Sequence, residues 1–149
     1  MEQSILSNEN KYNLLAGRVP MLVNRFLSQQ LKNEGIPLTR EQWSVLAVLW
    51  KSDGCSQQHI ADATYRDKPG ITRLIDNLEK DNLVERRNDK NDRRLNLIFL
   101  TPKGKAMEEK VMKVANETLE KATENLSEQE ILTIKNGFEK IYENIKKYE

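Results

Sequence analysis

The 149-residue chain is long enough for one compact domain with a hydrophobic core, and its 32% of charged residues is typical of a globular protein with much exposed helix. Its single cysteine, Cys55, excludes an intrachain disulfide and fits a reducing compartment. The longest apolar run, Val45 to Trp50, is too short to span a bilayer. The N-terminus lacks the basic and apolar order of a secretory signal, so we expect a cytoplasmic protein.

The formal net charge of +1 is unevenly distributed along the chain. Residues 86–105 contain seven basic and two acidic side chains, most of them in the polar stretch RRNDKNDRR at 86–94. A basic patch on a nearly neutral chain is typical of a local contact with a polyanion. An ordinary solvated loop would have the same composition, so charge alone does not decide between the two.

The first predicted helix runs from about residue 10 to residue 32, because apolar residues recur there at helical spacing. Pro20 lies inside this helix and removes a backbone hydrogen bond, so we expect a kink near residues 16–20. A second helix is predicted to start at the capping box Thr39–Gln42 and to continue to about Trp50.

Residues 56–80 predict a helix, a four-residue turn and a second helix. Ser56 is the expected cap of the first helix. Pro69 falls in the first turn of the second, where its missing N–H is not needed. Residues Ile71 to Leu78 then place apolar side chains on one face of that helix.

Two predicted strands, 83–87 and 95–100, flank the basic stretch and indicate a β-hairpin. A long helix from about 102 to 124 follows it. A second capping box, Ser127–Glu130, opens a last helix whose apolar residues recur in steps of three and four up to Tyr148.

A helix–turn–helix followed by a basic hairpin predicts a mainly α fold with a small β-wing, a six-helix winged helix-turn-helix. The second helix of such a pair fits the major groove and presents polar side chains to base edges. An arginine at the tip of the hairpin can enter the minor groove, and a neighbouring aspartate can hold it in position. The predicted DNA-contacting residues are Ser56, Gln57, Lys68, Gly70, Thr72, Arg73, Asn77, Lys90, Arg93 and Arg94.

The segment from Asp67 to Gly104 resembles the signature of the MarR family of bacterial transcriptional regulators. The matching residues are Thr72-Arg73-Leu74, Asp76, Leu78-Glu79-Lys80, Leu83-Val84-Glu85-Arg86, Asp92-Arg93-Arg94 and Leu100-Thr101. The resemblance implies that Arg94 enters the minor groove, that Asp92 orients it and that Arg93 contacts a phosphate.

The resemblance also implies a homodimer that places two recognition helices in successive major grooves of a palindrome. Residues 1–36 and 102–149 would form the helical dimerisation region, and residues 37–101 the DNA-binding domain. The apolar stripes of the terminal helices favour dimerisation independently, since they exceed what a small winged domain can cover. Packing of these helices within one subunit is the alternative.

Two positions depart from the family pattern. Gly70 stands where the family often has serine or threonine, so one hydrogen bond to DNA is in doubt. Asn82 replaces the glycine that follows the recognition helix, but asparagine tolerates the left-handed backbone conformation, so the helix can still end there.

Members of the family often bind small aromatic or phenolic ligands between the dimerisation and winged regions. Tyr12, Met21, Trp43 and Trp50 could line such a cavity, although aromatic and methionine side chains at helical spacing are more often part of a core.

One cysteine and one histidine, Cys55 and His59, are too few for a metal site unless carboxylates or a second subunit complete it. We therefore expect no metal and no cofactor. Cys55 follows a helix end and precedes a helix start, which can lower a thiol pKa, but a small packed residue is the simpler interpretation.

The favoured function is a sequence-specific double-stranded DNA-binding regulator, a repressor of palindromic operators that a small ligand relieves. The alternative is a winged-helix protein-interaction module that does not bind DNA. Such a module has no reason to keep Thr72, Arg73, Arg93 and Arg94 polar and basic together. An enzyme is not expected, because the sequence has no phosphate-binding glycine loop, acid–base pair or nucleophile elbow.

Overall fold

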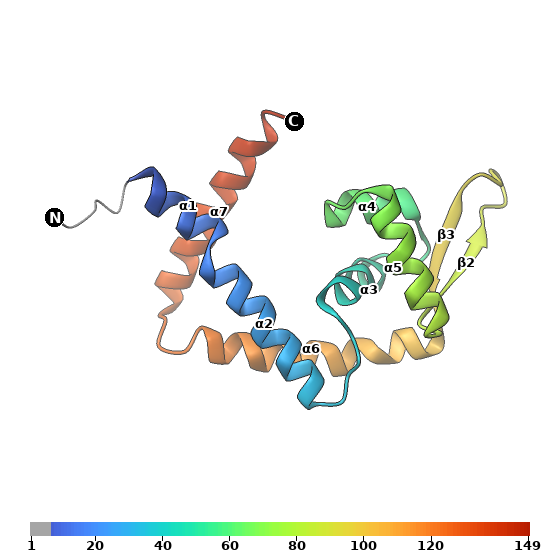
Figure 1. Ribbon diagram of the computed structural model, residues 1–149, viewed down its shortest axis with the longest axis horizontal. Coiled ribbons are helices and arrows are strands. Elements are labelled where there is room, and N and C mark those ends of the chain that lie inside the picture. Colours follow the sequence, from blue (N-terminus) through green and yellow to red (C-terminus); the bar gives the residue numbers. More distant parts are fainter. Residues whose placement is uncertain (1–6) are drawn as a thin grey trace. The chain divides into compact units, whose positions relative to one another are not determined.

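The computed structural model describes residues 7–149 (Figure 1). They form two compact units divided between Thr118 and Leu119. The helices are α1 (Asn8–Ala16), α2 (Arg18–Asn33), α3 (Arg40–Lys51), α4 (Gln57–Thr64), α5 (Lys68–Lys80), α6 (Pro102–Ala122) and α7 (Glu128–Lys146). The strands are β1 (Cys55–Ser56), β2 (Val84–Asn88) and β3 (Asn96–Leu100). The mainly helical winged helix-turn-helix expected from the sequence is confirmed.

The predicted first helix is interrupted, but not by proline. The break falls at Gly17, between α1 and α2, where a Cβ atom would lie 2.3 Å from the carbonyl oxygen of Asn13. Pro20 lies in the first turn of α2, where a helix needs no N–H from that residue. The expected kink region was right, whereas the mechanism, a proline inside a continuous helix, was wrong.

Both predicted capping boxes are confirmed. The hydroxyl of Thr39 accepts from the N–H of Gln42 at 3.1 Å, and the Gln42 side chain accepts from the N–H of Thr39 at 3.1 Å. Ser127 and Glu130 make the same reciprocal pair at the start of α7. These local contacts satisfy N–H groups that have no partner within the helix, and they fix where α3 and α7 begin.

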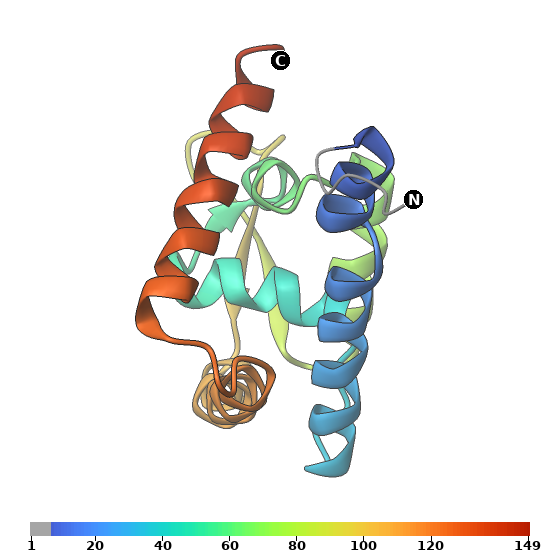
Figure 2. The ribbon, with the colours of Figure 1, turned by 90° about the vertical axis from the view of Figure 1, so that its left-hand side faces the viewer.

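The core of the first unit lies between α3, α4, α5 and the wing, and α2 and α6 add to it. Figure 2 shows α3 running across the direction of α2. The fully buried side chains include Leu46 and Leu49 of α3, Ile60 of α4, and Ile98 of β3, each with 0% exposure. Burying a side chain of this kind contributes about 1.5–3 kcal/mol. The core holds α5 by one face only, so its opposite face stays outside.

The wing is a three-stranded antiparallel sheet in the order β1-β3-β2. Val84 pairs with Leu100 and Arg86 with Ile98, which sets the register of the hairpin. The short strand β1, which pairs Cys55 with Ile98, was not predicted. Two residues give no detectable alternation in sequence, and only the partner strand defines them as a strand.

The polypeptide turn after α5 has the conformation expected from the sequence. Asn82 has a φ of 61°, in the left-handed region that asparagine tolerates better than most residues. The N–H groups of Asn82 and Leu83 return to the carbonyl oxygens of Glu79 and Leu78, which closes the helix end.

The start of α6 is joined tightly to this turn. The hydroxyl of Thr101 donates to the Asn82 carbonyl at 2.6 Å and accepts from the Gly104 N–H at 3.1 Å. The Trp50 indole N–H donates to the Gly104 carbonyl at 3.0 Å. A Cβ atom on Gly104 would lie 2.1 Å from the carbonyl oxygen of Leu83. The glycine is therefore required by close backbone approach between α6 and the turn.

The terminal helices leave much apolar surface uncovered within the chain. In α7 none of the residues is buried, and the side chains of Ile134, Phe138 and Ile145 are each about half exposed. In α1, Tyr12 and Leu14 are each 68% exposed. Within residues 7–149, no helix is both long enough and apolar enough to cross a membrane.

Gly104→Ala should destabilise the first unit by roughly 1–3 kcal/mol, because the new methyl group meets backbone that cannot rotate away. Thermal and urea unfolding at matched protein concentration would measure the loss. Ala106→Ser, an exposed change on the same helix, should stay within about 0.5 kcal/mol of wild type. Equal stability of Gly104→Ala and wild type would contradict the close approach.

Candidate nucleic-acid interface

The recognition helix α5 is fixed by its buried face and by its cap. Ile71, Ile75 and Leu78 have 0% exposure. The Asp67 carboxylate caps the helix by accepting from the Gly70 N–H at 2.7 Å. A Cβ atom on Gly70 would lie 2.8 Å from that carboxylate, so glycine gives the cap room. The predicted DNA contact at Gly70 stays a prediction.

The outer face of α5 contains both free and engaged polar side chains. Lys68, Arg73 and Asn77 are exposed, as predicted for residues that reach DNA. Thr72 is half-buried, and its hydroxyl donates to the Lys68 carbonyl at 2.9 Å. The same oxygen accepts from the Gln57 amide nitrogen at 2.6 Å, so Thr72 is less available to a base than the sequence suggests.

An arginine that was not predicted joins the wing to α5. Nη2 of Arg86 lies 2.6 Å from the Asp76 carboxylate and Nη1 lies 3.0 Å from that of Glu79. The Arg86 backbone N–H also donates to Glu79, at 3.1 Å. Only 21% of the Arg86 side chain is exposed. These contacts neutralise two carboxylates on the recognition helix and hold β2 against it.

The strand pattern contained a signal for this role of Arg86. Side chains two residues apart lie on the same face of a strand, so Arg86 shares the face of the buried Val84. A charged side chain on an inward face requires a partner. The helical spacing of three between Asp76 and Glu79 would have indicated which carboxylates could supply it.

The two aspartates of the wing loop have different roles in its structure. The Asp89 carboxylate accepts from the backbone N–H groups of Asn91 at 2.7 Å and Asp92 at 3.4 Å, which shapes the turn. The Asp92 carboxylate accepts from the Arg94 backbone N–H at 3.0 Å and from its Nε at 3.2 Å. The guanidinium of Arg94 is thus anchored at one end while its side chain remains 91% exposed.

The other basic side chains of the wing differ in their exposure and in their contacts with other side chains. Lys90 and Arg93 are exposed on the loop, as expected for residues that contact DNA. Arg87 pairs with Glu85, and its guanidinium lies 4.2 Å from the centre of the Phe99 ring. Arg87 was not predicted to contact DNA, and these partners hold it along the strand.

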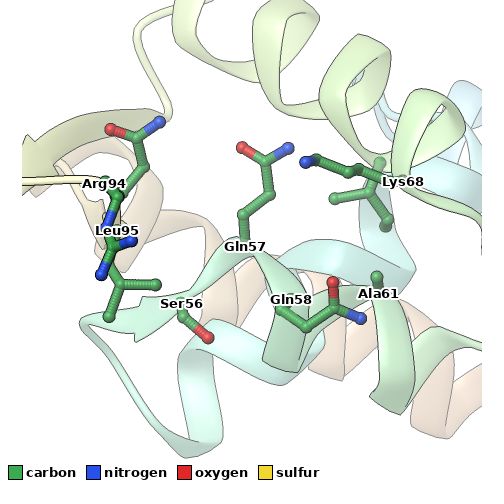
Figure 3. A pocket seen from close by; sticks show the side chains of 9 residues that line it. Ser56, Gln57, Gln58, Ala61, Lys68, Arg94 and Leu95 are labelled. Atoms are coloured by element: carbon green, nitrogen blue, oxygen red, sulfur yellow. The ribbon is translucent and has the colours of Figure 1, made fainter.

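A pocket of about 240 Å³ lies where α4, the start of α5 and the wing come together (Figure 3). Four predicted DNA-contacting residues line it, namely Ser56, Gln57, Lys68 and Arg94. Asn96 also lines it, and it was missed because a lone asparagine at a strand start carries no distinguishing pattern. Arg73, Asn77, Lys90 and Arg93 do not line this pocket.

The four candidate ligand-binding residues are spread over the first unit. Tyr12 and Met21 are 68% and 71% exposed on α1 and α2. Trp43 and Trp50 pack against the core, and the Trp43 indole nitrogen is a buried donor without a hydrogen-bond partner among residues 7–149. A second pocket, of about 580 Å³, lies between α2 and residues 36–41, and none of the four lines it. A shared ligand cavity stays a prediction.

Cys55 lies half-buried in β1 beside the core. Burial raises the pKa of its thiol, the charge of Asp53 raises that pKa further, and a backbone hydrogen bond opposes both. A raised pKa keeps the thiol protonated and poorly nucleophilic, which favours a packing role. Within residues 7–149, no three histidine, cysteine or acidic side chains gather closely enough to hold a metal ion.

Arg86→Ala should lower stability by roughly 1–3 kcal/mol, because it leaves two carboxylates without their charged partner. It should also weaken binding to any duplex, since the freed negative charges would face the phosphates. Unfolding curves and fluorescence anisotropy would measure the two effects. Arg87→Ala is the matched control, because it removes the same charge from the more exposed neighbour, and it should change both quantities less. Equal effects of the two variants would contradict the role of Arg86 in joining the wing to α5.

Comparisons with known proteins agree with this architecture. The sequence model of the MarR family matches residues 38–95. The HTH-type transcriptional regulator BilQ of Clostridium symbiosum is 31% identical over 70% of this chain and 72% of BilQ. A MarR transcriptional regulator from Methanosarcina mazei Go1 aligns with a TM-score of 0.78 and 28% identity, over 87% of this chain and 92% of that one. Reduced AbfR bound to DNA aligns with a TM-score of 0.77 and 24% identity, over 99% of both chains. From its sequence and its fold, the chain belongs to the MarR family of winged helix-turn-helix transcriptional regulators.

Proposed function

We propose that the protein is a dimeric repressor that binds a palindromic operator in double-stranded DNA and is released by a small ligand. The observation that carries the proposal is the exposed polar face of α5 beside a wing whose Arg94 is anchored by Asp92 yet 91% exposed. An arginine held in this way loses less conformational entropy on insertion into a groove. With DNA as its target, the protein would act in the cytoplasm.

In this proposal α5 and the wing read different grooves. Arg73 and Asn77 are exposed on α5, and their side chains match the donor and acceptor groups of guanine and adenine in the major groove. Arg94 on the wing would enter the adjacent minor groove, where the negative potential is strongest. Lys90 and Arg93 would contact phosphates. The structure of reduced AbfR bound to DNA, a protein with the same fold, supports DNA as the target.

The exposed apolar faces of the terminal helices support a homodimer. Ile134, Phe138 and Ile145 follow one another along one stripe of α7, each about half exposed. Apolar surface of this extent along a helix is seldom left in water. A two-fold dimer would present two copies of α5 to the two halves of a palindrome.

The environment of Trp43 supports release by a small ligand. The unpaired N–H of Trp43, buried beside the core, could donate to an acceptor group of an aromatic or phenolic ligand. Tyr12, Met21 and Trp50 are the other candidate contacts. A ligand acts only if it binds the free and DNA-bound conformations with different affinity.

The division of labour between α5 and the wing predicts different losses for two variants. Arg94→Ala should weaken binding to operator and scrambled duplexes by similar factors and should lower the salt slope by about one per subunit. Asn77→Ala should cost about 1–3 kcal/mol on the operator and little on scrambled DNA. Salt titrations on both duplexes, with the operator taken from a palindrome beside the gene, would measure these losses.

Lys110→Ala is the matched control for Arg94→Ala, because it removes an exposed positive charge from α6 rather than from the wing. It should leave both affinities nearly unchanged. Equal, sequence-independent losses for Asn77→Ala and Arg94→Ala would contradict the division of labour. Failure of the wild-type protein to bind either duplex would favour the protein-interaction alternative.

Ile134→Asp should disrupt the dimer, since it would bury an unpaired charge at the proposed interface. Because Ile134 is 48% exposed in the single chain, the subunit itself should stay folded. Sedimentation velocity at several concentrations would report the assembly state. Asn136→Asp adds the same charge to the opposite face of α7 and should leave the dimer intact. An unchanged dimer for Ile134→Asp would show that the interface lies elsewhere.

A further inference from the structure

The hydroxyl of Thr72 determines how the side chain of Gln57 is oriented. A threonine hydroxyl has one hydrogen to donate, and here that hydrogen goes to the Lys68 carbonyl at 2.9 Å. The oxygen can therefore meet Gln57 only as an acceptor. Gln57 must turn its NH₂ group, not its carbonyl, toward Thr72, and their distance of 2.6 Å agrees with this arrangement.

Gln57 reaches this position from the first residue of α4, and its side chain is half-buried. In Figure 3 it points between Lys68 on one side and Arg94 and Leu95 on the other. After the bond to Thr72, its amide nitrogen retains a second N–H, and no other residue within 7–149 accepts from it in a described hydrogen bond. A directed, neutral donor therefore lies between two basic residues.

The surroundings of this donor suit an anion better than a base edge. Two basic and no acidic side chains line the pocket, although Asp92 contacts Arg94 from outside it. Base edges are neutral, whereas every nucleotide of DNA carries a negative phosphate. The pocket lies at the start of α5 and beside the wing. With α5 in a major groove and the wing in the adjacent minor groove, the DNA backbone between the two grooves would pass over this pocket.

We propose that this pocket receives one backbone phosphodiester of DNA, with Gln57 as a hydrogen-bond donor to it and Thr72 as the residue that positions Gln57. Lys68 supplies attractive charge beside the phosphate, and the charge of Arg94, whose side chain enters the adjacent minor groove, adds to it from the wing. This inference rests on the proposed DNA-binding function and goes beyond it, since Thr72 then acts through another side chain and does not read a base. Contacts of this kind fix the position of a protein on DNA without carrying sequence information.

A double-mutant cycle tests directly whether Thr72 acts through Gln57. Gln57→Ala should lower affinity about tenfold, and Thr72→Val should lower it about three- to tenfold, because a hydrogen bond to a charged group is lost or misdirected. Both losses should be the same on operator and scrambled duplexes, and neither should change the salt slope, since neither side chain is charged. In the double variant, Thr72→Val should add nothing to Gln57→Ala.

Two further variants separate positioning from folding. Thr72→Ser keeps the acceptor oxygen and should restore wild-type affinity. Thr64→Val is the matched control, because the Thr64 hydroxyl also donates to the carbonyl four residues earlier, at 2.7 Å, but holds no glutamine. Its DNA affinity should equal that of the wild type.

The phosphate itself can be located by replacing single phosphates of each half-site with uncharged methylphosphonates. One position should weaken binding by the wild-type protein and have a smaller effect on Gln57→Ala, because that variant has already lost the contact.

Additive losses in the double variant would contradict the proposal that Thr72 acts through Gln57. A Thr72→Val loss confined to the operator would contradict it as well. The absence of any phosphate position that couples to Gln57 would also overturn it. In each of these cases the wild-type protein would still bind DNA, so the proposed function would survive. If the wild type bound neither duplex, both proposals would fail.

Discussion

The burial of one face of α5 is the constraint on which the proposed interface depends. Ile71, Ile75 and Leu78 are completely buried, and they occupy positions three and four residues apart. Because a helix held along one stripe cannot rotate, the same burial decides that Arg73 and Asn77 face outward. Neighbouring elements are positioned by this fixed helix. The wing is held to α5 by Arg86, and the turn at Asn82 meets the start of α6 where Gly104 closely approaches Leu83.

Behind the exposed face, polar contacts set the orientation of side chains that a helix or strand leaves free. Arg86 holds Asp76 and Glu79, Asp92 holds Arg94, and Thr72 holds Gln57. Each contact lowers the number of conformations that must be given up on binding. The Arg86 contacts also neutralise carboxylates that would otherwise repel phosphates. Electrostatics and pre-organisation thus act together in the same small region.

The two compact units differ in how far their apolar side chains are buried. The first unit has a continuous core from Leu27 to Ala115. In the second, α7 has no buried residue, although its sequence repeats apolar side chains in steps of three and four. A helix with that pattern is stable in water only when something covers its apolar stripe. The homodimer we propose would supply that cover and would give the protein the two-fold symmetry of a palindrome.

By itself, the sequence determined the features that depend on neighbours within a few residues. The capping boxes at Thr39 and Ser127, the left-handed turn at Asn82 and the order of helices and hairpin follow from local hydrogen bonding and periodicity, and they were predicted correctly. The order of these elements was enough to predict the fold, and the motif residues between Asp67 and Gly104 indicated the family.

Only the tertiary structure decided which side chains meet. The strand β1 exists because β3 lies beside it, and Thr72 is engaged because Gln57, 15 residues earlier, is brought against it. The break at Gly17 was not predicted, because a single glycine is tolerated inside a helix whereas proline is a stronger helix-breaking signal. Contacts between elements depend on the packing of the whole core, and a pattern of spacing within one element seldom identifies its partner in another.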